Sequence, residues 1–186
     1  MDALTRRRMI MLAPLGVAAA VGGGFWGLLM RMEQGTYEPH ELPSMLVGKP
    51  LPKFSLPGQP PSPGFSNSEI ISGKLPALVN FFASWCLPCI EEAPNLARLR
   101  ELGVPLWGIA YKDKTDATDA FLDQHGDPYL RVARDASGMT AINFGLYGVP
   151  ETYVVDKGGI VRRRIPGGIS QEMMRDSILP LLLSLG

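Results

Sequence analysis

An apolar run that leads into two cysteines limits the folds open to this chain more than any other feature. Residues 75–83 read LPALVNFFA, and after one serine the motif Trp85-Cys86-Leu87-Pro88-Cys89 follows. A short, nearly continuous apolar run predicts a strand that is buried on both faces. Apolar side chains then recur at helical spacing up to Gly103, a residue that suits the end of a helix. Because proline is tolerated in the first helical turn, the motif predicts a helix that begins at the cysteines.

The sequence beyond residue 48 alternates between strand-like and helix-like patterns. We expect a short edge strand at 51–56, a buried strand at 104–111, a weak strand at 130–132, a hairpin of 152–156 with 160–165, and helices at 116–124, 139–144 and 170–185. Strands and helices alternate first, and a hairpin and a helix follow. This order predicts an α/β fold with a central mixed β-sheet flanked by helices.

The N-terminal residues predict in which compartment the domain lies. Residues 9–30 carry no charge over 22 positions, close to the roughly 20 apolar residues that cross a bilayer. Three arginines at 6–8 precede this run, and positive charge keeps its own end of a membrane segment in the cytoplasm. We therefore predict an N-terminal transmembrane helix or export signal at 1–31, a polar tether at 32–47 and one domain at 48–186.

Two other interpretations of the N-terminus stay open. The small residues at 17–20 suit the cleavage region of a removable signal, and residues 5–10 resemble a twin-arginine export signal. We favour an uncleaved anchor, because residues 25–29 continue the apolar run beyond any cut and Trp26 suits a membrane interface. All three interpretations export the domain from the cytoplasm, which keeps thiols reduced, into an oxidising compartment.

Charge and histidine content argue against nucleic acid and metal as ligands. Beyond residue 31 the chain has 14 basic and 17 acidic side chains, and a mildly acidic domain does not favour nucleic acid. The only histidines, His40 and His125, lie far from the cysteines in the sequence and lack the spacing of metal ligands. We therefore expect no nucleic acid partner and no metal site.

The cysteine pair is interpreted as a redox couple. A structural cross-link between residues three apart closes almost no loop, so it would add little stability. At the head of a helix, free backbone N–H groups and the positive end of the helix dipole favour a thiolate. We expect Cys86 to be the exposed nucleophile and Cys89, one turn further in, to be the resolving thiol. An inert buried pair stays open as the alternative.

The buried strand, the motif Trp85 to Cys89 and a later Val149-Pro150 ahead of another strand resemble the thioredoxin fold. The resemblance implies that Pro150 is a cis proline that lies against the cysteine pair. It also implies that the backbone of Val149 is open to an incoming chain, which would pair with it as an added strand. Trp85 would help to shape the same groove. Trp85, Val149 and Pro150 are therefore the expected substrate-docking residues.

Further segments resemble a narrower family, from about residue 47 to the C-terminus. They are Gly48-Lys49-Pro50, Tyr111-Lys112-Asp113, Tyr147-Gly148-Val149-Pro150-Glu151-Thr152 and the hairpin at 156–162. Together they are similar to the membrane-anchored thiol:disulfide interchange proteins of cytochrome c maturation, the DsbE (CcmG) type. The resemblance implies reduction of the Cys-x-x-Cys-His disulfide of apocytochrome c, or of its mixed disulfide, before haem is attached.

The same resemblance implies partners, cofactors and location. The partners would be apocytochrome c or cytochrome c maturation thiol proteins, and electrons would come from a transmembrane thiol reductant of the DsbD or CcdA type. No cofactor is implied beyond a redox-active Cys86–Cys89 disulfide. The protein would cross the bacterial inner membrane once, with its C-terminal domain in the periplasm.

Two glutamates are expected to tune the couple. Thioredoxin has a buried aspartate six residues before its first cysteine, whereas this chain has Asn80, which cannot take up a proton. Glu92 and Glu151 match acidic positions of the DsbE type. Negative charge near the couple disfavours a thiolate and so makes the dithiol a better reductant, and either carboxyl could relay a proton. The alternative for Glu92 is a merely favourable charge in the first turns of a helix.

The predicted function is that of a thiol-disulfide oxidoreductase that reduces apocytochrome c, and two other functions stay open. One is a general exported reductase or oxidant on the same fold. The other is a module that holds unfolded apocytochrome c without essential thiol chemistry. Replacing both cysteines with serine would separate the two classes, because a holding module would keep its binding.

Overall fold

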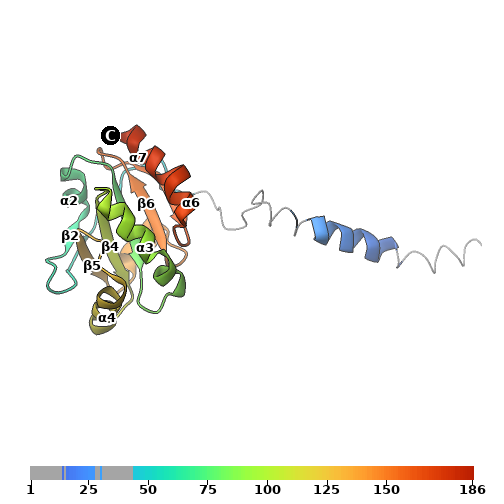
Figure 1. Ribbon diagram of the computed structural model, residues 1–186, viewed down its shortest axis with the longest axis horizontal. Coiled ribbons are helices and arrows are strands. Elements are labelled where there is room, and N and C mark those ends of the chain that lie inside the picture. The colour runs from blue at the N-terminus through green and yellow to red at the C-terminus, as the bar shows by residue number, and fades with distance from the viewer. Residues whose placement is uncertain (1–13, 15, 28–29, 31–43) are drawn as a thin grey trace, which may run out of the picture. The chain divides into compact units, whose positions relative to one another are not determined.

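The structure is a computed structural model that describes residues 14, 16–27, 30 and 44–186 (Figure 1). Contacts divide the chain into two units, Met1–Leu42 and Pro43–Gly186. The described residues of the first unit are helical and exposed. The arginines at 6–8 and most of the predicted tether lie outside the described residues. Within the described part, no helix is long and apolar enough to cross a membrane. The domain boundaries expected from the sequence stay a prediction.

A five-stranded mixed sheet forms the centre of the second unit. Its strand order is β5-β4-β3-β6-β7. Strands β3, β4 and β5 are parallel, β6 is antiparallel to β3, and β7 is antiparallel to β6. The strands are β3 (Ala77–Phe82), β4 (Leu106–Tyr111), β5 (Arg131–Asp135), β6 (Glu151–Val155) and β7 (Val161–Pro166). Every residue of β3 is buried, because this central strand is covered on both faces. The predicted buried strand and mixed sheet are confirmed.

Helices cover both faces of this sheet (Figure 1). One face packs against α3 (Leu87–Glu101), α4 (Thr115–His125) and a C-terminal segment of α6 (Gln171–Met173), the π-helical η1 (Met174–Ile178) and α7 (Leu179–Leu185). The other face packs against α2 (Asn67–Ser72), α5 (Met139–Phe144) and a small sheet of β1 (Ser55–Leu56) and β2 (Phe65–Ser66). The edge strand expected at 51–56 is thus reduced to β1, which pairs with β2 and not with the main sheet.

The C-terminal helix predicted at 170–185 is present but not uniform. The π-helical turns of η1 separate α6 from α7. Pro180 lies in the first turn of α7 and has no N–H to donate to a carbonyl four residues earlier, which explains the change of helix type at this point. Met174, Ile178 and Leu182 are still buried, so the amphipathic pattern is kept.

A proline-rich loop at 57–64 covers the outer edge of β5. The Gln59 N–H donates to the Val132 carbonyl at 2.9 Å, and the Arg134 N–H donates to the Pro57 carbonyl at 2.9 Å. Open strand edges tend to pair with other chains. The loop therefore protects the main sheet on this side.

Candidate active site

β3 and α3 bring both cysteines to one end of the sheet. After β3 the chain turns through residues 83–85, and Cys86 then caps α3 with an extended backbone (φ −96°, ψ 107°). The Cys89 N–H donates a hydrogen bond to Cys86 Sγ at 3.3 Å. Pro88 lies in the first turn, where its missing N–H leaves no helical bond unmade. The predicted start of the helix at the cysteines is confirmed.

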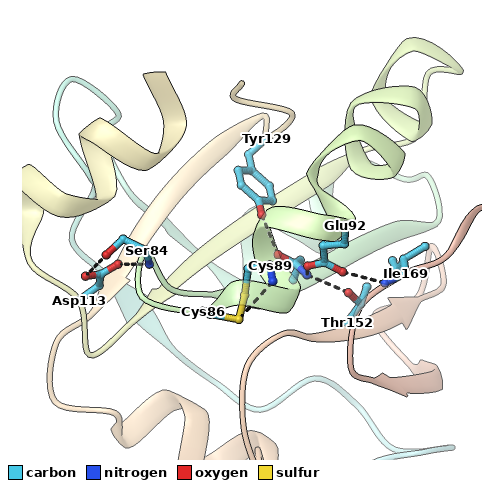
Figure 2. The surroundings of a disulfide bond; sticks show 9 residues. Ser84, Cys86, Cys89, Glu92, Asp113, Tyr129, Thr152 and Ile169 are labelled. Atoms are coloured by element: carbon cyan, nitrogen blue, oxygen red, sulfur yellow. Dashed lines mark hydrogen bonds between the residues drawn. A yellow bond between two sulfur atoms is a disulfide. The ribbon is translucent and has the colours of Figure 1, made fainter. Parts of the chain in front are cut away.

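Cys86 and Cys89 form a disulfide, with their Cα atoms 5.3 Å apart (Figure 2). Cys86 is only 4% exposed and Cys89 only 2%. The prediction of an exposed Cys86 is therefore wrong for this oxidised form. The reason is that Cys86 Sγ is bonded to Cys89 and packs in the apolar cluster under α3. The flanking side chains are the exposed ones, with Trp85 at 63% and Leu87 at 65%.

Asp113 anchors the turn that carries the motif (Figure 2). Its Oδ2 accepts a bond from the Ser84 N–H at 2.6 Å, and its Oδ1 accepts one from the Ser84 hydroxyl at 2.9 Å. The Lys114 N–H also donates to Oδ1, at 2.8 Å. One carboxylate therefore ties the loop after β4 to the residue just before Trp85.

Asp113→Ala is expected to lower the free energy of unfolding by about 2 kcal/mol, because it removes the acceptor of three hydrogen bonds at once. Ser84→Ala is the matched control, since it deletes one donor and keeps the two backbone bonds, and about 1 kcal/mol is expected. Urea unfolding of the oxidised protein measures both values. An Asp113→Ala variant as stable as the wild type would show that these bonds do not hold the turn.

Glu92 is a buried carboxyl one helical turn after Cys89 (Figure 2). Its side chain lies on α3 and the residue is 1% exposed. Its Oε1 accepts a bond from Asn80 Nδ2 at 3.0 Å, and its Oε2 accepts one from the Ile169 N–H at 3.0 Å. Residues three apart in a helix lie on the same side, so the carboxyl and the disulfide are neighbours.

Burial raises the pKa of Glu92 from 4.5 to about 7, although the bonds from Ile169 and Asn80 oppose this rise. A carboxyl with a pKa near neutrality can both take up and release a proton under physiological conditions. The Glu92 carboxyl, at its predicted position beside the couple, therefore has a pKa that suits a proton relay. Its role in the reaction stays a prediction.

Asn80 connects Glu92 to two further side chains. Asn80 Nδ2 donates to Thr152 Oγ1 at 2.9 Å, and Asn80 Oδ1 accepts a bond from the Tyr129 hydroxyl at 2.7 Å. Asn80 is completely buried, and both ends of its amide are hydrogen bonded. A fully bonded buried network is rigid, because each unmade bond would leave a costly polar group.

A cleft of about 380 Å³ runs past Glu92. It lies between the first turns of α3, at Pro88 and Asn95, and the segment from Gly168 to Gln171. The Asn95 side chain donates to the Ile169 carbonyl at 2.8 Å and so holds the two walls together. The buried carboxyl thus borders a cleft on the surface.

Glu151 does not join this network. Side chains alternate along a strand, so Thr152 faces Asn80 while Glu151 and Tyr153 face the opposite side of the sheet. Arg164 donates to Oε1 of Glu151 at 2.7 Å and to Oε2 at 2.8 Å, and the Tyr153 hydroxyl donates to Oε1 as well. The structure therefore keeps the two predicted tuning glutamates on opposite faces. The tuning role of Glu151 stays a prediction.

The predicted docking residues lie around the disulfide cluster. The Val149–Pro150 peptide bond is cis, as the resemblance implied. Val149 is half-buried and packs against the apolar cluster that contains both cysteines, and the Pro150 carbonyl accepts a bond from the Gly167 N–H at 2.9 Å. Trp85 is largely exposed. Substrate docking by these three residues stays a prediction.

Tyr129 and Thr152 are parts of the site that the sequence analysis did not identify. Tyr129 lies 49 residues from its partner Asn80 and belongs to no motif. One signal was present in the sequence, because Gly108 interrupts an apolar strand and such a glycine often marks a close approach. A Cβ atom on Gly108 would lie 2.8 Å from Cγ of the Tyr129 ring.

No metal-binding cluster is found in the part of the chain that the structure describes, where no three histidine, cysteine, aspartate or glutamate side chains are arranged to hold an ion. The chemistry that this site can perform is carried by its two sulfur atoms. The expectation that no cofactor is needed stays a prediction.

Comparison with known proteins identifies the family. The AhpC/TSA family matches residues 47–164. The chain is 41% identical to the thiol:disulfide interchange protein DsbE of Pseudomonas aeruginosa, over 94% of this chain and 93% of that protein. It is 37% identical to the thiol:disulfide interchange protein HelX of Rhodobacter capsulatus, over 93% of this chain and 95% of that protein. The chain belongs to the DsbE family of thiol:disulfide interchange proteins.

A solved structure shows which fold the domain has. A thiol:disulfide interchange protein of the thioredoxin family from Chlorobium tepidum has a TM-score of 0.60 and 26% identity, covering 72% of this chain and 95% of that one. The domain thus has a thioredoxin-like fold. Like its DsbE relatives, the protein is a thiol-disulfide oxidoreductase. The bond between Cys86 and Cys89 is the oxidised form of the pair, and two electrons and two protons convert it to the dithiol.

Proposed function

We propose that this protein is a membrane-anchored periplasmic reductant of apocytochrome c. It would reduce the Cys-x-x-Cys-His disulfide, or the mixed disulfide of that motif with another maturation protein, before haem is attached. The observation that carries the proposal is the buried carboxyl of Glu92 beside Cys89. A carboxylate there destabilises a thiolate and thus the reduced pair, so the dithiol becomes the stronger reductant.

The reaction begins with attack by Cys86 on a client disulfide. The Cys86 thiolate, favoured by the N-terminus of α3, forms a bond to one client sulfur, and the other client sulfur leaves and takes up a proton. The exposed Trp85 and the backbone of Val149 beside Pro150 guide the client chain to this position. The product of this step is a mixed disulfide between client and enzyme.

Cys89 completes the reaction. Its thiolate attacks Cys86 Sγ and forms the enzyme disulfide, while the bond between Cys86 and the client breaks. The second client sulfur leaves and takes up a proton, so the client is released as a dithiol. Glu92 takes up the proton that Cys89 loses, because its pKa of about 7 suits a general base at neutral pH. Glu151 is proposed to tune the couple only from the opposite face of the sheet, through its charge and its ion pair with Arg164.

The proposed location is supported by the N-terminal sequence. The uncharged residues 9–30, with three arginines before them, support a single membrane anchor with the enzyme domain in the periplasm of a bacterium. In this oxidising compartment the dithiol must be regenerated from the cytoplasmic side. A transmembrane thiol reductant of the DsbD or CcdA type is the proposed electron donor.

The test compares two oxidised substrates with the reduced full-length protein in detergent. One substrate is a peptide with a Cys-x-x-Cys-His disulfide, and the other is insulin. We expect the peptide to react about tenfold faster or more, which corresponds to about 1.4 kcal/mol of preference in the transition state. A matched peptide with alanine in place of the histidine reports whether the haem-binding motif itself is recognised.

Other outcomes would favour the remaining candidates. Equal rates on the peptide and insulin would contradict the specialisation and leave a general exported reductase. Oxidation of a reduced peptide by the disulfide form, faster than the reverse reaction, would identify an oxidant. A Cys86→Ser, Cys89→Ser variant that still supports cytochrome c maturation in cells would identify a module that only holds the client.

A further inference from the structure

Tyr129 occupies a position that two strands of the main sheet are built to accept. Its ring stacks on Phe82 of β3, with the ring centres 5.0 Å apart and the planes 18° from parallel. On the neighbouring strand β4, Gly108 has no side chain and so leaves room for the ring. A Cβ atom at this position would lie 2.8 Å from Cγ of Tyr129. The residue is 7% exposed. The hydroxyl group is therefore held at a defined point inside the domain.

The hydroxyl fixes which way the Asn80 amide points. Burial, with the nearby charge of Glu92, raises the pKa of Tyr129 well above its usual value, so the hydroxyl keeps its proton. In the structure it donates to Asn80 Oδ1 at 2.7 Å. The opposite end of the amide must then face Glu92 and Thr152 with its two N–H groups. In this orientation Asn80 acts toward the Glu92 carboxyl as a hydrogen-bond donor and not as an acceptor.

We propose that Tyr129 is a positioning residue of the thiol exchange reaction: its hydroxyl fixes the Asn80 amide, which holds the Glu92 carboxylate as an acceptor one helical turn from Cys89. This inference rests on the proposed role of Glu92 as the group that takes up the Cys89 proton. It adds a residue from the segment before β5 to a site otherwise formed by β3, α3 and β6. The Tyr129 hydroxyl acts through its bond to Asn80 Oδ1.

The other groups around Glu92 do not supply this orientation. On α3 the titratable neighbours are Cys89 and Glu91, and beyond Asn80 they are Tyr129 and Asp127, whose Oδ1 accepts the Tyr129 N–H at 2.9 Å. From β6, the Thr152 hydroxyl accepts a bond from Asn80. From the turn before α6, the Ile169 N–H donates to Glu92 Oε2. Neither of these two groups titrates near neutrality. Asn80 is thus the donor to Oε1, and Tyr129 is the donor to Asn80 Oδ1.

Removing the hydroxyl has a defined consequence. In Tyr129→Phe the buried Asn80 Oδ1 loses its donor, and the amide is no longer held in the orientation that points its N–H groups at Glu92. Donation to Glu92 Oε1 weakens, and the carboxylate loses more from this than the protonated carboxyl does. The protonated form of Glu92 is therefore favoured, and its titration midpoint rises.

The experiment is an NMR titration of the Glu92 side-chain carboxyl carbon in the full-length, oxidised protein in detergent. The disulfide form is used because its cysteines do not titrate, and the resonance is assigned by its loss in Glu92→Gln. The wild-type midpoint is expected near pH 7.

Tyr129→Phe is expected to raise the Glu92 midpoint by about 1 pH unit, a tenfold change in the proton affinity of the carboxyl. Tyr153→Phe is the matched control, because it deletes a buried tyrosine hydroxyl on the other face of the sheet, and it should leave the midpoint unchanged.

A double-mutant cycle tests the route through Asn80. Asn80→Ala should also raise the midpoint, and adding Tyr129→Phe to it should cause no further change. A Tyr129→Phe midpoint equal to that of the wild type, or equal shifts with and without Asn80, would overturn the inference. If Tyr129→Phe does not fold, Gly108→Ala decides, because it displaces the ring and keeps the hydroxyl; it should raise the same midpoint, and an unchanged midpoint would overturn the inference.

The pH dependence of peptide reduction separates this inference from the proposed function. Glu92→Gln should abolish the part of the rate profile centred near pH 7, and Tyr129→Phe should move that part upward by the same amount as the NMR midpoint. A Glu92→Gln profile identical to the wild type would refute the role of Glu92 in proton transfer. The effect of Tyr129→Phe on the Glu92 midpoint is measured by the NMR titration and would stand or fall on that result alone.

Discussion

Cys89→Ser is expected to trap the protein as a stable mixed disulfide with its client. Cys86 caps α3, where the Cys89 N–H and the helix dipole stabilise its sulfur as a thiolate, so attack on the client still occurs. Without the second sulfur, nothing attacks Cys86 Sγ to release the client. Mass spectrometry under non-reducing conditions, after mixing with an oxidised Cys-x-x-Cys-His peptide, measures the adduct.

Cys86→Ser provides the contrasting variant. It removes the proposed nucleophile, and the rate of peptide reduction is expected to fall by roughly 10³-fold or more. Little adduct should form, because only Cys86 caps α3, where a backbone N–H and the helix dipole favour a thiolate. Equal yields of adduct from both serine variants would show that the roles of attacking and resolving thiol are not assigned as proposed.

The oxidised wild type is expected to lose stability as the pH rises from 4.5 to about 7. The folded protein holds the Glu92 proton more tightly than the unfolded chain does, since burial raises the carboxyl pKa from 4.5 to about 7. In this interval the native state binds more protons, so the free energy of unfolding falls with pH. The shift corresponds to about 3 kcal/mol, which is fully present below pH 4.5 and lost above about pH 8.

Glu92→Gln should remove this slope, and urea unfolding of the disulfide form across the same pH range measures it. The matched control is Glu91→Gln, which neutralises an exposed carboxylate on the same turn of α3 and should keep the wild-type slope. A Glu92→Gln variant with an unchanged slope would mean that another group causes the pH dependence.

The local features of the site were predictable from the sequence. The apolar run before Trp85, the spacing of the cysteines and Pro88 in the first turn are contiguous, and short-range sterics and backbone bonding determine their structure. The same holds for the alternation of elements that leads to a mixed sheet, and the structure confirms both. Glu92 was identified from the resemblance to the DsbE type, and its place one helical turn after Cys89 follows from helix geometry.

Contacts between distant segments decided the rest. Cys86 proved to be buried, because its sulfur packs under side chains from several elements. Glu151 follows Pro150 directly, yet the alternation along β6 turns it away from Glu92 and toward Arg164. A motif shared with relatives does not state which face of a sheet a residue occupies.

The sequence by itself determined that a redox-active pair would stand at the head of a helix next to a buried strand. Only the tertiary structure decided how acidic the neighbouring carboxyl is, because that depends on burial and on donors from separate strands and loops. Tyr129 reaches Asn80 across 49 residues, and Ile169 reaches Glu92 across 77. Such distances in sequence carry no periodic signal, since they are bridged only when the sheet and its helices pack together.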